Sequence, residues 1–416
     1  MHRIAMLSVH TCPMAALGGK ETGGMNVYVR EVSRELGAQG LLVDIYTRSQ
    51  DATLERVRQL WPRVRVIHLP AGPEEPYHKN LVYDHLPQFA AGLHQFTADE
   101  GISYDLIHSH YWLSGWVARE VANKHPVPSV HMFHTLGRMK NAIGRDPSEK
   151  ESPTRIRVED QLMRDMDRIV APTPLERAQM IELYGADAHR IVVIPLGVDL
   201  SMFRPIPCQE AMRAVGIDLP ATSRLVLFVG RLDPVKGLET LLRAMCELTE
   251  LEPDLAKDLC LAVIGGDTDE EQTDLADGLE CLDKLKDEVG LHDLVAFLGS
   301  RAQDSLPYYY SAAEVCVVPS HYESFGLVAL EAMACGTPVI ASRVGGLQHT
   351  IEDGVSGFLV PAGDSDALAD KLRVLLCDSD LRQRLGANAH DEAQHYTWQR
   401  VGERILDLYE ELWQQE

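Results

Sequence analysis

Short apolar runs alternate with longer amphipathic segments along almost the whole chain. Met25, Val29, Val32 and Leu36 fall at i, i+4, i+7 and i+11, which is the spacing of one helical face. Runs typical of buried strands lie at Ile4–Val9, Val43–Tyr46, Val64–Leu69, Leu106–His108, Ser129–Met132, Ile169–Ala171, Ile191–Ile194, Leu225–Val229, Leu261–Ile264, Val295–Leu298, Val315–Val318, Val339–Ala341 and Phe358–Val360. Apolar strands that alternate with helices predict doubly wound, parallel α/β sheets.

These runs are too many for one sheet of ordinary size, so we expect two domains. The segment Pro195–Asp199, followed by Phe203–Pro207, is rich in Pro and Gly and loses the periodicity, which favours a boundary there. We predict one Rossmann-like domain over residues 1–195 and a second over residues 196–397. Ligands of open α/β sheets bind at the carboxyl ends of the strands, so we expect the two domains to face each other across a cleft.

The net charge of −23 makes nucleic acid or an anionic membrane an unfavourable partner. The eight cysteines are scattered and form no Cys-x-x-Cys pair, which disfavours structural zinc and a disulfide framework. No apolar run approaches the ~18 residues of a membrane span. The chain opens directly on a predicted strand without a leader pattern, so we expect a cytoplasmic protein with no membrane span.

Two glutamates, Glu323 and Glu331, lie in a segment that follows one predicted strand and opens a helix. Backbone N–H groups and the helix dipole attract anions at such a position. Carboxylates repel phosphate but bind hydroxyl groups, which suggests a ligand that carries both phosphate and sugar. Eight helical positions would separate the pair by ~12 Å, whereas the carboxyls of a retaining glycosidase lie roughly 5 Å apart. We expect one carboxylate to bind a donor sugar and the other a ribose.

Arg231 and Lys236 lie in the turn Gly230–Gly237, between a predicted strand and the next helix. Two cations at the end of a strand suit a diphosphate, although such residues are by default surface charges. Their occurrence together with the glutamate pair favours the functional interpretation.

The Gly-rich loop Leu17–Asn26 joins the first predicted strand to the first helix, where backbone can approach a ligand closely. It matches neither the dinucleotide-binding motif nor the P-loop, and a plain capped loop is an equal interpretation. Two clusters of histidine and aromatic residues, His108–Trp112 and His131–Thr135, follow two successive strands. Neither cluster has a metal-ligand spacing supported by carboxylates, so no metal site is expected.

Four cations of the N-terminal half stand alone in the sequence: Lys79, Lys140, Arg155 and Arg157. By default they are solvated charges. Only a second anionic ligand would give them a shared role.

Taken together, these motifs resemble the retaining glycosyltransferases of the GT-B fold, family 4, over essentially the whole chain. The resemblance rests on the Glu-x7-Glu motif of Glu323 and Glu331, the Arg231/Lys236 pair and the later Gly345-Gly346. It implies two Rossmann-like domains that face each other across a cleft. It also implies that the last helix, within residues 398–416, packs back onto the N-terminal domain.

The resemblance implies roles for individual residues. Arg231 and Lys236 would hold the nucleotide diphosphate, Glu331 the ribose, and Glu323 the transferred sugar. The implied donor set is Gly23, Gly24, Arg231, Lys236, Ser300, Arg301, Glu323, Phe325, Gly326, Leu327, Val328 and Glu331, and the implied catalytic set is His134, Arg231, Lys236 and Glu323.

Two subfamilies share features with the chain. Gly23–Val29 and His108–Gly115 are similar to the mycothiol-pathway enzymes, which join N-acetylglucosamine to inositol 1-phosphate. His134–Lys140 is similar to the sucrose-phosphate synthases, which have a basic site for fructose 6-phosphate. The likeness to the mycothiol-pathway enzymes implies that the acceptor's phosphate binds at four residues, Lys79, Tyr111, Thr135 and Arg155. It also implies that Asn26 lies near the inositol.

We therefore predict a glycosyltransferase that moves a hexosyl unit, with retention, from a UDP-sugar to a phosphorylated acceptor. Because no nucleophile stands out, we favour a front-face reaction in which the leaving diphosphate accepts the acceptor's proton. No cofactor is expected to be required, and a divalent metal ion is compatible but not essential. The protein is expected to be a monomer or a homodimer.

Three alternatives stay open at this point. One is a GT-B-like sugar-nucleotide epimerase, which needs no acceptor. A second is a glycosyltransferase with an unphosphorylated glycan acceptor, and a third is a sugar-nucleotide-binding protein without catalysis.

Overall fold

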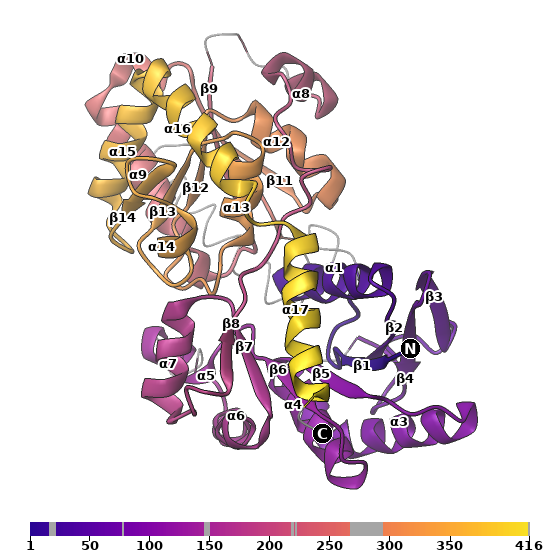
Figure 1. Ribbon diagram of the computed structural model, residues 1–416. Helices are drawn as coiled ribbons and strands as arrows, with labels where there is room; N and C mark the ends of the chain where they lie inside the picture. The colour runs from indigo at the N-terminus through magenta and orange to yellow at the C-terminus, as the bar shows by residue number, and fades with distance from the viewer. Residues whose placement is uncertain are drawn as a thin grey trace. The chain divides into compact units, whose positions relative to one another are not determined.

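The computed structural model describes residues 1–15, 22–76, 79–144, 150–217, 220, 223–266 and 294–414, which form two compact units (Figure 1). Unit 1 contains Met1–Ala15, Glu21–Gly197 and Trp398–Glu416, and unit 2 contains Val198–Thr397. The first half of the predicted Gly-rich loop, from Leu17 to Glu21, lies outside the described residues.

Unit 1 contains an eight-stranded sheet in the order β3-β4-β2-β1-β5-β6-β7-β8. Neighbouring strands are parallel, except that β3 is antiparallel to β4. In the central strand β1 the residues from Ile4 to Leu7 are all buried, as expected for a strand covered on both faces. The strands are β1 Arg3–Leu7, β2 Leu42–Arg48, β3 Val57–Trp61, β4 Val64–Leu69, β5 Leu106–His110, β6 Ser129–Met132, β7 Arg168–Ala171 and β8 Ile191–Val193.

Strand β3 has no counterpart among the strands expected from the sequence. It forms the edge of the sheet, and its first three residues, Val57 to Gln59, are exposed. An edge strand that is not covered needs no continuous apolar run, because its backbone pairs with one neighbour only. The apolar-run criterion therefore misses it.

The helices of unit 1 are α1 Gly24–Ala38, α2 Lys79–Val82, α3 Leu86–Glu100, α4 Tyr111–Lys124, α5 Gly137–Ile143, α6 Pro153–Asp165, α7 Pro174–Tyr184 and α17 Trp398–Trp413. Helix α6 begins where the Ser152 hydroxyl accepts a hydrogen bond from the backbone N–H of Arg155 (3.2 Å), with Pro153 in the first turn. Tertiary contacts hold α17 in this unit, since the indole of Trp413 donates to the carbonyl of Asp105 (3.0 Å).

Unit 2 contains a six-stranded, parallel sheet in the order β11-β10-β9-β12-β13-β14. Its strands are β9 Arg224–Val229, β10 Leu259–Ile264, β11 Val295–Gly299, β12 Val315–Val318, β13 Val339–Ser342 and β14 Gly357–Val360. Its helices are α8 Cys208–Ala214, α9 Leu238–Leu251, α10 Pro253–Ala256, α12 Leu306–Ala312, α13 Leu327–Ala334, α14 Leu347–Thr350, α15 Ser365–Cys377 and α16 Ser379–Ala393.

The predicted fold class, two doubly wound α/β sheets, is confirmed by these two units. Each unit has its own apolar core, for example around Phe89 and Leu162 in unit 1 and around Leu241 and Leu372 in unit 2. In the described ranges no helix is long and apolar enough to cross a membrane. The cysteines within those ranges are free thiols.

Candidate active site

The donor residues that the sequence implies after residue 198 gather at the carboxyl edge of the unit 2 sheet. Arg231 follows β9, Ser300 follows β11, and the segment with Glu323 follows β12. Because these strands are parallel, their carboxyl ends lie along one edge, which is the usual ligand position in open α/β sheets.

Lys236 and Glu323 form the closest charged contact at this edge. Nζ of Lys236 lies 2.6 Å from Oε2 of Glu323, and both side chains are largely buried. The Asp233 carboxylate accepts the N–H of Val235 (3.0 Å), which shapes the short turn that presents Lys236. The carbonyl of Val235 then accepts the N–H of His321 (2.8 Å), so the two loops are tied together.

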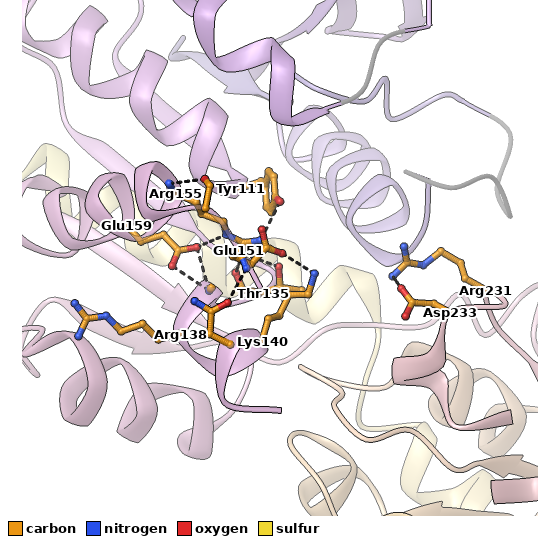
Figure 2. Close-up of polar contacts among 12 residues, drawn as sticks. Tyr111, Thr135, Arg138, Lys140, Glu151, Arg155, Glu159, Arg231 and Asp233 are labelled. Atoms are coloured by element: carbon orange, nitrogen blue, oxygen red, sulfur yellow. Dashed lines mark hydrogen bonds and ion pairs between the residues drawn. The ribbon is translucent and has the colours of Figure 1, made fainter. Parts of the chain in front are cut away.

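Arg231 has a different environment. Its guanidinium lies 3.6 Å from the Asp233 carboxylate, and both side chains are 40% exposed (Figure 2). Arg231 is therefore a half-exposed cation at the same edge.

Glu331 is separated from this ion pair by its neighbours. It is buried on α13, and its carboxylate accepts the hydroxyl proton of Tyr310 (2.9 Å) and an amide proton of Gln303 (3.4 Å). Burial, followed by the charge of Glu331, raises the pKa of Tyr310 well above its ordinary value, so the phenol stays a donor. Glu323 faces a cation and Glu331 faces neutral donors, which fits two different binding roles.

Gly345 and Gly346 explain how the Glu323 loop is held. A Cβ added to Gly345 would lie 1.6 Å from the carbonyl oxygen of Glu323, and its backbone has the left-handed φ of 46°. The N–H of Gly346 donates to that same carbonyl (3.0 Å). Gly345 and Gly346 thus let their own backbone lie directly against the backbone of the Glu323 loop.

Two of the remaining donor candidates, Gly23 and Gly24, lie in unit 1 at the start of α1, and the others lie in unit 2. Ser300 donates to the carbonyl of Gly266 (2.8 Å), and Arg301 donates to the hydroxyl of Tyr309 (3.0 Å). Gly326 caps α13, and Leu327 and Val328 form its first turn, where backbone N–H groups have no partner within the helix. Phe325, just before them, is buried.

In unit 1 the structure brings Tyr111, Thr135 and Arg155 together (Figure 2). Nη1 of Arg155 donates to the Tyr111 hydroxyl (3.0 Å), and Nη2 donates to the carbonyl and the hydroxyl of Thr135 (2.7 and 3.0 Å). The guanidinium also lies over the Tyr111 ring, 4.8 Å from its centroid. Three of the acceptor residues implied by the sequence therefore form one contact network.

Two carboxylates complete this network. Nε of Arg155 donates to Glu159 (2.7 Å), and Nη1 lies 2.8 Å from Oε1 of Glu151. Lys140 also lies 2.6 Å from that oxygen of Glu151. With these contacts all N–H groups of the buried Arg155 guanidinium have a partner.

Two residues at the ends of β5 and β6 have unusual backbone conformations. Tyr111 and His134 have φ of 72° and 60°, in the left-handed region that non-glycine residues rarely adopt. Such strain concentrates at functional sites, where surrounding structure enforces it. Both positions belong to the sets implied by the sequence.

The contacts of His134 define which of its nitrogens carries the proton. Nε2 of His110 contacts the sulfur of Met6, which can only accept, so Nε2 carries the proton and Nδ1 of His110 is an acceptor. Nδ1 of His110 lies 3.1 Å from Nε2 of His134, which must then donate. Burial lowers the pKa of His134 to about 3, so the ring is neutral and its Nδ1 can accept a hydrogen bond from a hydroxyl.

The other predicted residues of unit 1 have local roles. Asn26 donates to the Thr11 hydroxyl and the Cys12 carbonyl (2.9 and 2.8 Å) and accepts the N–H of Gly23 (3.0 Å), which fixes the start of α1 at Gly24. Lys79 is the first residue of α2. The pKa of His10 is lowered to about 3, first by burial and next by the positive charge of Lys79.

Several residues of these networks carry no predicted role from the sequence: Glu151, Glu159, Gln303 and Tyr310. Lys140 is expected only as one of four cations to which a second anionic ligand would give a shared role. One signal was available for Glu159, because Arg155 and Glu159 lie four positions apart on α6, which makes them neighbours on one helical face, whereas Glu151 precedes the helix. The residues that face Glu331 carry no comparable pattern. Among the described residues no group of three or more His, Cys, Asp or Glu side chains could hold a metal ion.

Comparisons with known proteins agree with this architecture. The family described as "Glycosyl transferases group 1" matches residues 210–392, and the "Glycosyl transferase 4-like domain" matches residues 23–197. The chain is 42% identical over 408 residues to the D-inositol 3-phosphate glycosyltransferase of Nocardiopsis dassonvillei, covering 98% of this chain and 94% of that protein. It is 40% identical over 413 residues to the enzyme of the same name from Saccharomonospora viridis, with 98% and 94% covered.

Solved structures give the same result at the level of the fold. The sucrose-phosphate synthase of Thermosynechococcus elongatus has a TM-score of 0.91 and 36% identity, and the match covers 100% of both chains. Anabaena HepE, solved with UDP-glucose, has a TM-score of 0.77 and 22% identity, covering 99% of this chain and 100% of that one. The fold is therefore GT-B, as the sequence predicted.

Proposed function

The chain belongs to the family of group 1 glycosyl transferases, and from this premise we propose that it moves a hexosyl unit from a UDP-sugar to a phosphorylated acceptor, with retention. The observation that carries the proposal is the cluster of unit 1 in which two cations, Lys140 and Arg155, share one carboxylate oxygen. Lys140 and Arg155 lie within 2.6 and 2.8 Å of one carboxylate oxygen, beside Tyr111 and Thr135. Such a cluster can hold a second anion besides the donor's diphosphate.

The relatives support a phosphorylated acceptor. Relatives that are 40–42% identical in sequence are named for D-inositol 3-phosphate, and the structural relative at 36% identity is a sucrose-phosphate synthase. Inositol phosphate and fructose 6-phosphate both carry one phosphate group and several free hydroxyl groups. The enzyme class is glycosyltransferase in both cases.

On the donor side we propose that Arg231 and Lys236 bind the diphosphate of the UDP-sugar. Glu323 would accept hydrogen bonds from the transferred sugar, and Glu331 from the ribose. Backbone N–H groups from Phe325 to Val328 would bind phosphate and sugar. Ser300 and Arg301 would lie near the base, with Gly23 and Gly24 near the diphosphate.

The reaction we propose is a front-face displacement. The bond between the anomeric carbon and the diphosphate oxygen breaks while the acceptor hydroxyl attacks from the same face. The leaving diphosphate takes the hydroxyl proton, and Arg231 and Lys236 stabilise the charge that develops on it. The acceptor nitrogen of His134 would accept a hydrogen bond from a sugar hydroxyl and so orient the ring.

A nucleotide-release screen tests the proposal. It would cross UDP-glucose, UDP-N-acetylglucosamine and ADP-glucose with fructose 6-phosphate, inositol 1-phosphate, fructose and inositol. We expect nucleotide release only in wells with a UDP-sugar and a phosphorylated acceptor, and an α-linked product by NMR. Activity only with unphosphorylated acceptors would refute the acceptor assignment, and conversion of the donor without any acceptor would indicate an epimerase.

Gly345 offers a test of how the Glu323 loop is positioned. In Gly345→Ala the added methyl would have to displace the Glu323 backbone, and we expect kcat/KM for the donor to fall by about 10²-fold, as a displacement of about 1 Å can do. Gly354→Ala is the matched control, because Gly354 has a similar left-handed φ of 79° but no atom within 4 Å of the added Cβ. Equal kcat/KM values for the two variants would count against a functional role for the Glu323 loop.

A further inference from the structure

One oxygen of Glu151 is shared by two cations. Oε1 lies 2.6 Å from Nζ of Lys140 and 2.8 Å from Nη1 of Arg155 (Figure 2). The side chain is only 9% exposed, and the backbone N–H of Glu151 donates to the side chain of Asn141 (2.6 Å). A carboxylate thus lies at the point where these two cations converge.

The two carboxylates next to Arg155 differ in how they are held. Glu159 accepts the N–H of Gly137 (3.0 Å), the hydroxyl of Tyr184 (2.5 Å) and Nε of Arg155, and it is fully buried. The described partners of the Glu151 carboxylate are the two cations alone. Glu159 is therefore built into the protein framework, whereas Glu151 could be exchanged for another anion without breaking other side-chain contacts.

Glu151 keeps its negative charge at this position. Burial alone would raise the pKa of its carboxyl, but the charges of Arg155 and Lys140 lower that pKa below its ordinary value. Protonation near neutral pH therefore does not release the cations. They become available only when the carboxylate moves away.

We propose that Glu151 occupies the position of the acceptor's phosphate in the unliganded protein and thereby selects for phosphorylated acceptors. The inference rests on the proposed function in one respect, that the acceptor phosphate binds at Arg155. A phosphate carries about −1.5 to −2 charge and three strong acceptor oxygens, so it can replace a carboxylate between two cations. A neutral hydroxyl group cannot, because Arg155 would keep only Glu159 as a charged partner and the half-buried Lys140 would lose its anionic partner.

A side chain that occupies a binding site competes with the ligand. It lowers the apparent affinity for the ligand in proportion to the fraction of protein molecules in which the site is free. Removing the charge should therefore tighten binding of a phosphate. In Glu151→Gln we expect the dissociation constant of inorganic phosphate, measured by calorimetry without donor, to fall by about tenfold, or about 1.4 kcal/mol. The KM of the phosphorylated acceptor should fall by a similar factor, with the donor KM unchanged.

Three further variants make the test specific. Glu182→Gln, on the exposed side of α7, makes the same change in net charge and should leave phosphate binding as in the wild type. Adding Lys140→Ala to Glu151→Gln should remove the gain. Glu151→Asp keeps the charge on a shorter side chain, so we expect a smaller gain in phosphate affinity. This variant replaces Glu151→Gln in the test if the Gln variant does not fold.

Phosphate binding that is unchanged or weaker in both Glu151 variants would overturn the proposal, as would a gain that survives Lys140→Ala. The calorimetry needs neither donor nor turnover. Failure of the transfer reaction and failure of this inference can therefore be distinguished.

Discussion

The Lys236→Ala variant is expected to lose about 10³-fold or more in kcat/KM while its fold survives. Lys236 is the cation that reaches the Glu323 carboxylate at 2.6 Å, at the edge of the sheet where the diphosphate is proposed to leave. A preorganised hydrogen-bond donor directed at developing negative charge contributes about 10²–10³-fold to the rate. Loss of a full positive charge from a partly buried site should reduce the rate by the upper end of this range. Steady-state kinetics with varied donor would measure the loss.

The ion pair itself contributes little to folding. Its two side chains are 23% and 18% exposed, and a partly screened pair stabilises a protein by about 1 kcal/mol or less. Thermal unfolding of Lys236→Ala should therefore remain close to that of the wild type. Lys257→Ala is the control, because Lys257 is exposed and pairs only with the exposed Asp254 among the described residues. Near-normal turnover in a folded Lys236→Ala protein would refute the donor-site assignment.

Unit 1 is expected to lose several kcal/mol of unfolding free energy as the pH falls from about 7 to 5. Burial lowers the pKa of His10, His108 and His134 to about 3, and that of His110 and His131 well below the ordinary value of 6.5. The unfolded chain takes up protons on these side chains below pH 6.5, whereas in the folded unit burial keeps all five rings neutral well below that pH. Each histidine therefore costs about 1.4 kcal/mol of stability per pH unit in that window.

Denaturant unfolding at a series of pH values would measure this dependence. The window from pH 6.5 to 5 lies above the ordinary pKa of carboxyl groups, so it isolates the histidines. His131→Gln should reduce the slope by the contribution of one proton, whereas His189→Gln, at an exposed position, should leave it unchanged. A flat stability profile over this window would show that the five imidazoles are not held neutral, and imidazole ¹⁵N chemical shifts would identify which ones titrate.

The sequence predicts where the proposed donor residues of unit 2 lie, because most of them are in loops after parallel strands. Once β9, β11 and β12 are identified, geometry alone places Arg231, Ser300 and Glu323 at one edge. The acceptor cluster is harder to predict, since Tyr111, Thr135 and Arg155 come from separate segments, and Glu151 lacks any mark that sets it apart from an exposed glutamate. The i, i+4 spacing of Arg155 and Glu159 is compatible with an ion pair, but no local spacing shows that Lys140 and Arg155 share an oxygen of Glu151.

By itself, then, the sequence determined the two α/β units and the loops that carry the chemistry, because apolar periodicity and strand order are local properties of the chain. The tertiary structure decided which side chains meet. Lys236 contacts Glu323 across 87 positions, and His108 contacts the hydroxyl of Tyr409 across 301. Such contacts depend on how distant segments of the chain pack together. The burial that results keeps the histidines neutral, and the shared contacts fix the position of Glu151.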